Sequence, residues 1–265
     1  MSSPTDIRLS FNEVPEIYDR VRPQYPEPMY EALFAELPPA PAVLEVGPGT
    51  GQATVALLDH GARVTAVEIG SRLAQLLRSK VESNSRLEVV TGDFESVDLP
   101  LQSFDAVISA CAYHWISPEA RLTRPAALLR NHGLFAIIDL NQVDSPTDKG
   151  YFDRVQEVYQ RFDGPDTAEP KPRQYPETVV PPIYDQIQAS TLFEPPILLR
   201  YHWDQTYTAE DYGDLLRSYS GTQMMEPKPR EAMAQEMVRI ANQEFGGQVT
   251  RPLVVTLAMA RLAAQ

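Results

Sequence analysis

Cysteine is almost absent from this chain of 265 residues, which contains Cys111 and no other. A single thiol cannot form an intramolecular disulfide, so the fold has to be stabilised without one. Proteins with so few cysteines are typical of a reducing compartment, and we therefore expect a cytoplasmic location. Because the chemistry inferred below needs no covalent enzyme intermediate, we expect Cys111 to be a small packing residue.

Basic residues are few, and long apolar runs are missing. The chain has 23 Lys and Arg against 36 Asp and Glu, a formal net charge of −13. Nucleic-acid binding normally needs clustered basic residues, so we expect no nucleic-acid partner. No run approaches the roughly 18 apolar residues of a membrane span. The first residues also lack a basic segment followed by an apolar one, so neither a secretory signal nor a membrane partner is expected.

Strand and helix patterns alternate from about residue 42 to residue 139. This order is typical of a parallel sheet with crossover helices. The expected strands are residues 43–46, 64–67, 87–91, 104–109, 134–139, 197–206 and 254–260. The sequence therefore predicts an α/β fold, a doubly wound, Rossmann-like sheet of seven mostly parallel strands with the last one antiparallel.

Helices are expected between these strands. Gly61 should end the first one, Ser71 should cap the second, and Ser117 with Pro118 should start the third, which Pro125 should break. Further amphipathic helices are expected near residues 152–162 and 231–245.

Two long segments interrupt the later part of the pattern. We expect residues 1–40 to form an N-terminal lid segment and residues 41–265 the main domain, with insertions at 144–195 and 207–250. Residues 163–182 hold six prolines and are expected to be an irregular surface excursion. Ligands of open α/β sheets bind at the carboxyl ends of the strands, so the insertions are expected to form a substrate cap there. Packing between subunits is the alternative, and both a monomer and a homodimer stay open.

A glycine-rich turn follows the first strand. Glu45 precedes Gly47, Gly49 and Gly51, and Glu68 stands at the end of the second strand. Glycine lets the backbone approach a ligand closely, and a carboxylate at this position can accept hydrogen bonds from both ribose hydroxyls. Dinucleotide-binding proteins carry G-x-G-x-x-G instead of this G-x-G-x-G spacing. The pattern thus favours a nucleoside ligand that has no pyrophosphate.

These residues resemble motif I of the class I methyltransferases, the superfamily that uses S-adenosylmethionine. The resemblance implies that S-adenosylmethionine is the cofactor, with Glu45 and the glycines near it and Glu68 on its ribose. Asp93 and Phe94 follow the third strand, where the family places an acidic residue near adenine. The alternative for Asp93 is a helix N-cap. Ala110, at the end of the fourth strand, is expected to present its backbone to the cofactor.

The fourth strand is followed by Tyr113, His114 and Trp115. Tyr113 and Trp115 are expected to form a substrate wall, and His114 is the candidate catalytic residue, because neutral imidazole accepts protons near neutral pH. Whether His114 is a base or orients the acceptor stays open. The Asn- or Asp-Pro-Pro-Tyr motif of enzymes that methylate bases and glutamine amides is absent here, which disfavours those acceptors.

The N-terminal segment Tyr-x-x-x-Arg-Pro-x-Tyr-Pro resembles a bacterial small-molecule group related to the aconitate-type methyltransferases. In that group the segment folds over the methionine end of the cofactor, which implies cofactor contacts for Tyr18 and Arg22. The segments around Tyr207 and Tyr219 also look like this group, and we expect both tyrosines to bind substrate.

Together these features predict methyl transfer from S-adenosylmethionine to a small organic acceptor, with O-, N- and C-methylation all open. One alternative is a protein that binds the cofactor without turnover. The other, a nicotinamide-dependent oxidoreductase, keeps only the fold and Glu68.

Overall fold

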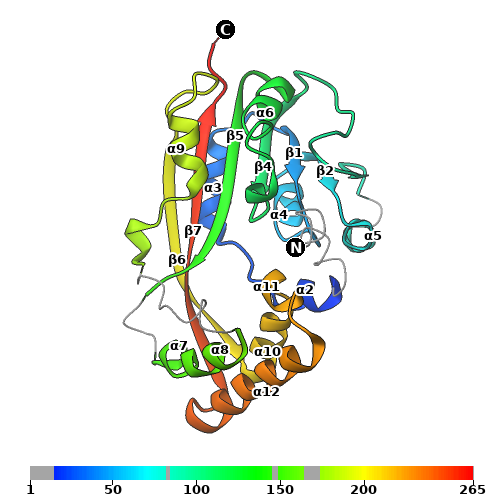
Figure 1. Cartoon of the computed structure of the whole chain (residues 1–265). Helices are drawn as coiled ribbons and strands as arrows, with labels where there is room; N and C mark the ends of the chain where they lie inside the picture. Colours follow the sequence, from blue (N-terminus) through cyan, green and yellow to red (C-terminus); the bar gives the residue numbers. More distant parts are fainter. Residues whose placement is uncertain (1–14, 82–83, 145–148, 164–173, 265) are drawn as a thin grey trace. The chain divides into compact units, whose positions relative to one another are not determined.

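A seven-stranded sheet is the centre of the fold (Figure 1). The computed structural model describes residues 15–81, 84–144, 149–163 and 174–264. The strands are β1 (Ala42–Val46), β2 (Arg63–Glu68), β3 (Leu87–Thr91), β4 (Phe104–Ala110), β5 (Leu129–Gln142), β6 (Ile197–Thr208) and β7 (Gln248–Arg261). Their order is β3-β2-β1-β4-β5-β7-β6, mostly parallel with one antiparallel strand. The predicted Rossmann-like α/β class is confirmed.

Helices connect the strands as the alternating pattern predicts. Those between residues 15 and 128 are α2 (Pro15–Val21), α3 (Glu27–Ala35), α4 (Thr54–Asp59), α5 (Ser71–Lys80) and α6 (Thr123–Leu128). Those further along are α7 (Tyr151–Arg154), α8 (Gln156–Asp163), α9 (Pro182–Gln188), α10 (Ala209–Arg217), α11 (Ser220–Gln223) and α12 (Pro227–Glu244). Short 3-10 turns cover η2 (Tyr113–Trp115) and η4 (Pro176–Thr178).

The parallel pairing places the ends of neighbouring strands side by side. Val46 at the end of β1 pairs with Val67 of β2, and Glu68 pairs with Thr91 at the end of β3. On its other side β1 pairs with β4, where Glu45 is opposite Ile108. The residues that follow these strands are therefore neighbours, which is the arrangement that the glycine turn and the acidic positions require.

Strand β5 starts earlier than the pattern predicts. The expected strand began at residue 134, whereas β5 begins at Leu129 and pairs there with Phe104. The register between β4 and β5 then shifts between Phe104 and Ala106. His132 has a φ of 59° within this stretch. Such an irregularity interrupts the alternation of side chains, which is why the sequence pattern conceals the first part of the strand.

Three predicted helix signals were wrong. Ser71 is not the N-cap of α5, because Gly70 occupies that position and donates its N–H to the Glu68 carboxylate at 2.7 Å. Ser117 begins a turn instead of a helix, since its carbonyl accepts hydrogen bonds from the N–H groups of residues 120 and 121. Pro125 lies in the first turn of α6, where its missing N–H breaks no hydrogen bond, so it does not break that helix.

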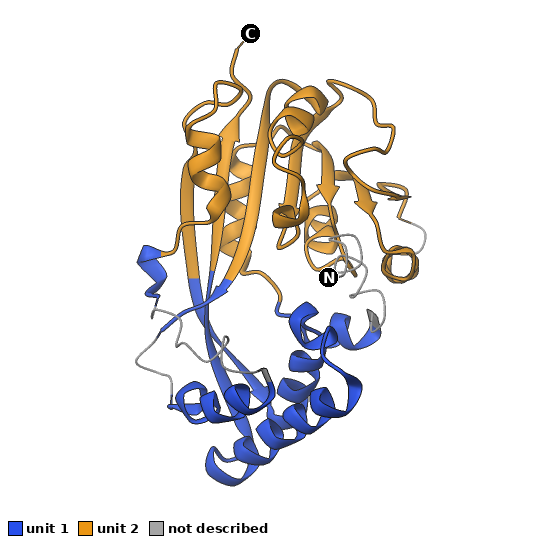
Figure 2. Ribbon diagram, in the orientation of Figure 1, with its two compact units in different colours: residues 1–23, 141–178, 202–254 blue, residues 24–140, 179–201, 255–265 orange. Residues whose placement is uncertain are grey.

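The chain divides into two compact units (Figure 2). Unit 1 comprises residues 1–23, 141–178 and 202–254, and unit 2 comprises residues 24–140, 179–201 and 255–265. The predicted boundaries at 1–40, 144–195 and 207–250 stay predictions. Parts of the lid segment and of the proline-rich excursion, residues 1–14 and 164–173, lie outside the described residues.

Each unit has its own apolar core. In unit 2, buried side chains of the strands, among them Leu44, Val107 and Phe135, pack into one cluster. In unit 1, Val155 of the α7–α8 segment packs with Leu215 of α10 and other buried side chains. Burial of this apolar surface is the main favourable term in the stability of each unit.

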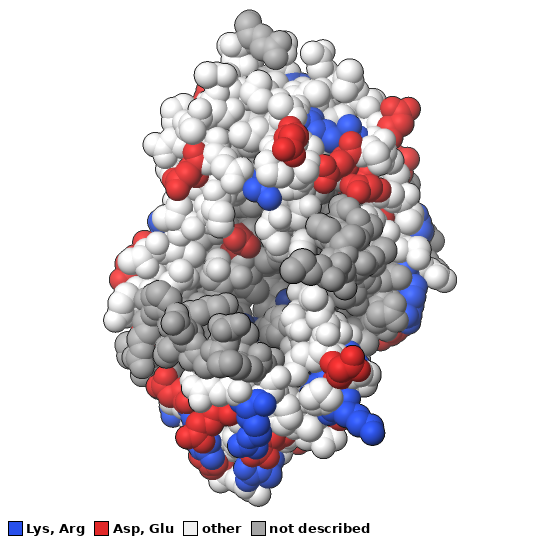
Figure 3. Space-filling view, viewed as in Figure 1, with Lys and Arg blue, Asp and Glu red and all other residues white. Residues whose placement is uncertain are grey.

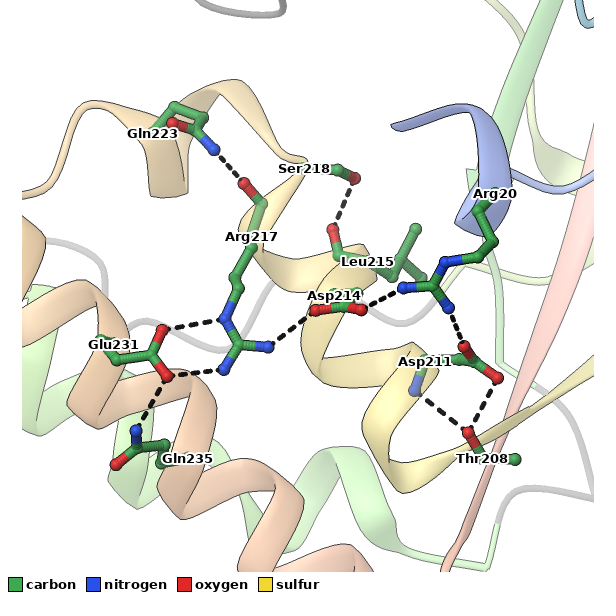
Figure 4. Close-up of polar contacts among 10 residues, drawn as sticks. All are labelled: Arg20, Thr208, Asp211, Asp214, Leu215, Arg217, Ser218, Gln223, Glu231 and Gln235. Atoms are coloured by element: carbon green, nitrogen blue, oxygen red, sulfur yellow. Dashed lines mark hydrogen bonds and ion pairs between the residues drawn. The ribbon is translucent and has the colours of Figure 1, made fainter. Parts of the chain in front are cut away.

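An ion-pair network joins three helices of unit 1 (Figure 4). Arg20 of α2 pairs with Asp211 and Asp214 of α10. Arg217 of α10 contacts Asp214 at 3.0 Å and binds both carboxylate oxygens of Glu231 on α12, at 2.8 and 2.9 Å. The hydrogen bonds from Arg217 lower the pKa of the Glu231 carboxyl. Because most of these groups are partly exposed, each ion pair adds little to the stability of unit 1.

Charged side chains are mixed in sign on the face drawn in Figure 3. Lys and Arg alternate there with Asp and Glu, and no broad basic field is visible among the described residues. Among the helices of the described ranges, none has both the length and the apolar character to cross a membrane.

Helices α10 and α12 approach closely at Gly213. A Cβ atom at this position would lie 2.6 Å from Cγ2 of Val238, which is far inside van der Waals contact. We predict that Gly213→Leu forces the helices apart and lowers the free energy of unfolding by about 2 kcal/mol or more. Urea denaturation measures the change. The matched control is Gly221→Leu, where no atom lies within 4 Å of the added Cβ. Equal stability of the two variants would contradict the predicted close packing.

Candidate functional site

The glycine turn after β1 has a backbone that other residues rarely adopt. Gly47, Gly49 and Gly51 have φ values of 68°, 59° and 96°. A Cβ on Gly47 would lie 2.5 Å from the Cβ of Ala112, and one on Gly51 would lie 2.6 Å from Cδ1 of Leu77. The turn therefore needs glycine both for its conformation and for close packing against the segment after β4 and against α5.

Glu68 joins the glycine turn to the end of β2. Its Oε2 accepts the N–H of Gly49 at 3.0 Å, and its Oε1 accepts the N–H of Gly70 at 2.7 Å. Burial raises the pKa of this carboxyl, while the main-chain N–H groups of Gly70, Gly49 and Ile69 oppose that rise. A carboxylate has about four acceptor positions, so these three main-chain donors leave part of its acceptor capacity open to a ligand.

Glu45 lies deeper than Glu68. Its side chain is 1% exposed, and its Oε2 accepts a hydrogen bond from the Thr54 hydroxyl at 2.6 Å. Burial raises its pKa to about 7, with the nearby Glu68 charge acting in the same direction and the Thr54 bond opposing it. The Glu45 carboxyl thus contacts Thr54, the first residue of α4. It is buried, so it has almost no surface open to a ligand.

Asp93 forms the turn after β3. Its Oδ1 accepts the N–H of Glu95 at 3.0 Å, and its carbonyl accepts the N–H of Val97. Asp93 thus accepts main-chain N–H groups of the residues that follow it, as the alternative prediction of a capping role for Asp93 expects. Phe94 is 3% exposed, and the Arg124 guanidinium lies 5.2 Å from the centre of its ring. The structure therefore places Phe94 in the core of unit 2 beneath Arg124.

The segment after β4 turns sharply at Cys111, whose φ is 55°. Its thiol accepts a hydrogen bond from the hydroxyl of Tyr25 at 3.5 Å. Ala110 is the last residue of β4 and comes directly before this turn. A non-glycine residue in the left-handed region costs energy and is often found beside functional sites. The strained turn brings Ala112 against Gly47, so the ends of β1 and β4 are fixed together.

Tyr113 does not line a substrate wall. It is 3% exposed, its ring packs 5.3 Å from that of Phe135, and its hydroxyl donates to the carbonyl of Arg121 at 2.7 Å. The residue order Tyr-His-Trp suggested a shared face, but η2 directs the first ring into the core. Its predicted contact with substrate is therefore corrected.

His114 and Trp115 lie side by side, with ring centres 4.7 Å apart. His114 is exposed to solvent, whereas Trp115 is half-buried. Partial desolvation and the positive charge of Arg121 lower the pKa of His114. The imidazole is therefore mostly neutral at pH 7 and able to accept a proton.

In unit 1 the structure brings together three of the residues predicted for cofactor and substrate. The guanidinium of Arg22 lies 4.5 Å from the ring centre of Tyr18 and 4.7 Å from that of Tyr219. Arg22 also donates to the carbonyl of Ser218 at 3.2 Å. Tyr207 is 7% exposed, and its hydroxyl lies close enough to Arg251 to interact with it.

The sequence did not single out Arg251, which lies 5.8 Å from the ring centre of Tyr219. The only sequence feature that could have marked Arg251 is its position between Val249 and Leu253, where a charged residue interrupts an apolar stretch. The aromatic side chains around it come from distant parts of the chain, so the sequence pattern could not show its surroundings.

Comparison with known proteins shows similarity to methyltransferases. Residues 44–137 match a family model described as a methyltransferase domain. An uncharacterized methyltransferase of Mycobacterium tuberculosis is 34% identical over 134 residues, which cover 50% of this chain and 53% of that protein. The dimethyladenosine transferase of Saccharomyces cerevisiae is 41% identical over 87 residues, which cover 32% of this chain and 27% of that one.

Two solved structures share the fold. The phosphoethanolamine N-methyltransferase 2 of Haemonchus contortus, in complex with phosphomonomethylethanolamine and S-adenosylhomocysteine, has a TM-score of 0.56 at 14% identity over 100% of this chain and 61% of that one. The YcgJ protein of Bacillus subtilis has a TM-score of 0.53 at 13% identity over 89% of this chain and 98% of that one.

Residues 44–137 of the chain are thus similar to a methyltransferase domain, and the fold is that of the solved methyltransferase structures. The matched domain runs from the middle of β1 into β5, so it contains the glycine turn, Glu68, Asp93 and His114. The chain spans about half the length of the first curated relatives that it matches, 53% of each.

The buried carboxyl of Glu45 makes stability depend on pH. Its pKa is about 7 in the folded protein, above its ordinary value of 4.5. Below pH 4.5 both states are protonated and nothing is lost, whereas the folded state is penalised progressively as pH rises to 7. We predict that Glu45→Gln removes up to about 3 kcal/mol of this penalty above pH 7 and little near pH 4.5. Urea denaturation at pH 5 and pH 8 measures it.

The control is Glu88→Gln, an exposed position on β3, which should change stability little at either pH. A difference between Glu45→Gln and the parent protein that stays the same at pH 5 and pH 8 would refute this assignment.

Proposed function

We propose that this protein transfers a methyl group from S-adenosylmethionine to a small organic acceptor. The proposal rests on two acidic residues at neighbouring strand ends: Glu68 is the last residue of β2, and Asp93 follows β3. A turn of three glycines with left-handed backbone conformations follows the adjacent strand β1. The matched methyltransferase domain contains all of these residues.

The residues of the site suit the adenosyl part of this cofactor. The acceptor capacity that the Glu68 carboxylate retains is proposed to receive the ribose hydroxyls. Asp93, just after the next strand, is proposed to accept a hydrogen bond from the adenine amino group. Tyr18 and Arg22 are proposed to bind the carboxylate of the cofactor's amino acid portion.

Methyl transfer needs little covalent chemistry from the protein. The cofactor supplies an electrophilic methyl group on a sulfonium, and the enzyme has to align the acceptor with it and exclude water. His114 is neutral at pH 7 and exposed, so it can orient the acceptor or remove its proton. Trp115 beside it offers an apolar surface against which an organic acceptor can pack.

The acceptor is proposed to be a small molecule. The similarity to a dimethyladenosine transferase covers 87 residues and 27% of that protein, so it says little about the acceptor. A net charge of −13 also disfavours a nucleic-acid acceptor. The Haemonchus structure with phosphomonomethylethanolamine shows that this fold accommodates a small acceptor in that protein. We further propose that the protein acts in the cytoplasm.

Cofactor binding is tested by calorimetric titration with S-adenosylhomocysteine. We expect saturable binding to the folded protein and a loss of about tenfold or more in affinity for Glu68→Gln, because a neutral amide accepts the ribose hydroxyls less strongly than a carboxylate. Glu88→Gln, exposed on β3, should bind as the parent does. A folded parent protein that does not bind S-adenosylhomocysteine would disprove the proposed function.

Turnover is tested with methyl-labelled S-adenosylmethionine in a cell extract, with mass spectrometry of the small molecules. A labelled product distinguishes an enzyme from a protein that only binds the cofactor. With that acceptor we expect His114→Ala to lower kcat/KM about 100-fold or more. A lower kcat would identify a base and a higher KM an orienting residue, whereas unchanged kinetics would remove His114 from the site.

A further inference from the structure

Asp139 on strand β5 is a half-buried carboxylate that the proposed mechanism does not use. It follows Ile137 and Ile138, which are both buried and paired with β4. The N–H of Cys111, just after β4, donates to the carbonyl of Ile138 at 2.8 Å. On the other side, the hydroxyl of Thr256 on β7 donates to the carbonyl of Asp139 at 3.4 Å. The main chain at Asp139 is therefore fixed by both neighbouring strands.

The end of β4 connects Asp139 to the glycine turn. Ala110, the last residue of β4, pairs with Ile138, one residue before Asp139. Two residues further on, the Cβ of Ala112 lies where a Cβ on Gly47 would approach it to 2.5 Å. Asp139, the segment after β4 and the glycine turn all belong to unit 2. Asp139 is thus at the carboxyl ends of the parallel strands, where open α/β sheets bind their ligands.

The burial of Asp139 is less well compensated than that of two other acidic residues of this sheet. Asp105 of β4 accepts a main-chain N–H at 2.7 Å and pairs with Arg130 at 2.6 Å. Glu68 of β2 accepts main-chain N–H groups with both of its oxygens. The Asp139 carboxylate has one donor among the described residues, the N–H of the adjacent Leu140. In the same part of the chain no basic side chain forms an ion pair with Asp139.

A positive charge is the partner that the Asp139 carboxylate lacks. Burial raises the pKa of this carboxyl, the Leu140 N–H opposes that rise, and no charged side chain contributes to it. Removing a carboxylate from water costs free energy that a nearby counter-charge offsets. Since the described chain does not provide this counter-charge at a ligand-binding edge, a bound ligand is the remaining source of it. An ammonium group supplies both the charge and N–H donors.

We infer that Asp139 binds an ammonium group of the methyl acceptor, which makes the acceptor an organic amine. The inference rests on the proposed function and deepens it by giving the chemical class of the acceptor. An N–H donor of the ammonium group forms a charge-assisted hydrogen bond with the carboxylate. The buried apolar side chains of Ile137 and Ile138 precede the carboxylate, and charges attract more strongly where water is partly excluded.

The cofactor also carries positive groups, an ammonium and a sulfonium, so the source of the cation has to be assigned. Strands β1 and β4 lie between β2 and β5. With neighbouring strands about 4.8 Å apart, Asp139 lies roughly 14 Å along the sheet from the strand of Glu68, the residue proposed for the ribose. We therefore assign the cation at Asp139 to the acceptor, and experiment separates the two sources.

The probes are benzylamine and benzyl alcohol, which have nearly the same shape and differ in charge. They are titrated at pH 7 and constant ionic strength and followed by ligand-observed NMR, with the protein saturated with S-adenosylhomocysteine and again without it. We expect benzylamine to bind about tenfold more tightly than benzyl alcohol, and Asp139→Asn to abolish this preference. The matched control Asp98→Asn, at an exposed position of the same unit, should retain it.

Three results with these probes would overturn the inference. The first is equal binding of benzylamine and benzyl alcohol by the parent protein, and the second is binding of neither. The third is a folded Asp139→Asn protein that still prefers benzylamine.

The source of the cation is tested by titrating the Asp139→Asn protein with cofactor analogues. The ligands are S-adenosylmethionine, S-adenosylhomocysteine, which lacks the sulfonium charge, and 5′-methylthioadenosine, which also lacks the amino acid. We expect the substitution to change none of the three affinities by more than twofold. Selective weakening of S-adenosylmethionine, or of both ligands that carry the amino acid, would assign Asp139 to the cofactor and overturn the inference.

A measurement on the parent protein keeps the test decisive should Asp139→Asn fail to fold. The pKa of the Asp139 carboxyl is followed by carbon-13 NMR with each probe at saturation. A bound ammonium group favours the charged carboxylate, so we expect benzylamine to lower this pKa by about 1 and benzyl alcohol to leave it unchanged. A carboxylate with a purely structural role would titrate alike with both probes, and that result would refute the inference.

The amine site and the proposed function can fail separately. If the protein does not bind S-adenosylhomocysteine but prefers benzylamine without it, the proposed function fails while the amine site stands. If the protein binds S-adenosylhomocysteine but shows no preference for benzylamine, the amine site fails while the proposed function stands.

Discussion

The carboxylate of Glu68 is the contact on which the candidate site depends. By accepting the N–H groups of Gly49 and Gly70, it fixes the glycine turn after β1 to the start of α5. The same group orders the backbone and keeps acceptor positions available for a ligand. Its burial raises its pKa, and the main-chain donors offset part of that cost. A neutral side chain here would weaken both roles at once.

Each unit contains a different set of the residues predicted for the site. Unit 2 contains the turn, the two acidic strand ends and His114, all on or beside the parallel part of the sheet. Unit 1 contains Arg22, Arg251 and the tyrosines, where positive charge lies among aromatic rings. The first set suits a nucleoside.

The sequence predicts the fold well because its signals are local. Apolar runs, glycines and their spacing identify the strands and the turn, and all seven expected strands are found. Errors occur where a distant side chain determines the outcome. Glu68 satisfies Gly70 and leaves Ser71 without a capping role, and Tyr113 turns into the core toward Phe135. The environment of Arg251 has the same origin, since Gln142, Tyr207 and Tyr219 come from separate segments.

The most direct test of the central claim is a crystal structure of the protein with S-adenosylhomocysteine. The account predicts that the ribose hydroxyls donate to the carboxylate of Glu68, with adenine beside Asp93 and no rearrangement of the glycine turn. A nucleoside bound elsewhere on the chain, or a Glu68 carboxylate that does not contact it, would contradict the account.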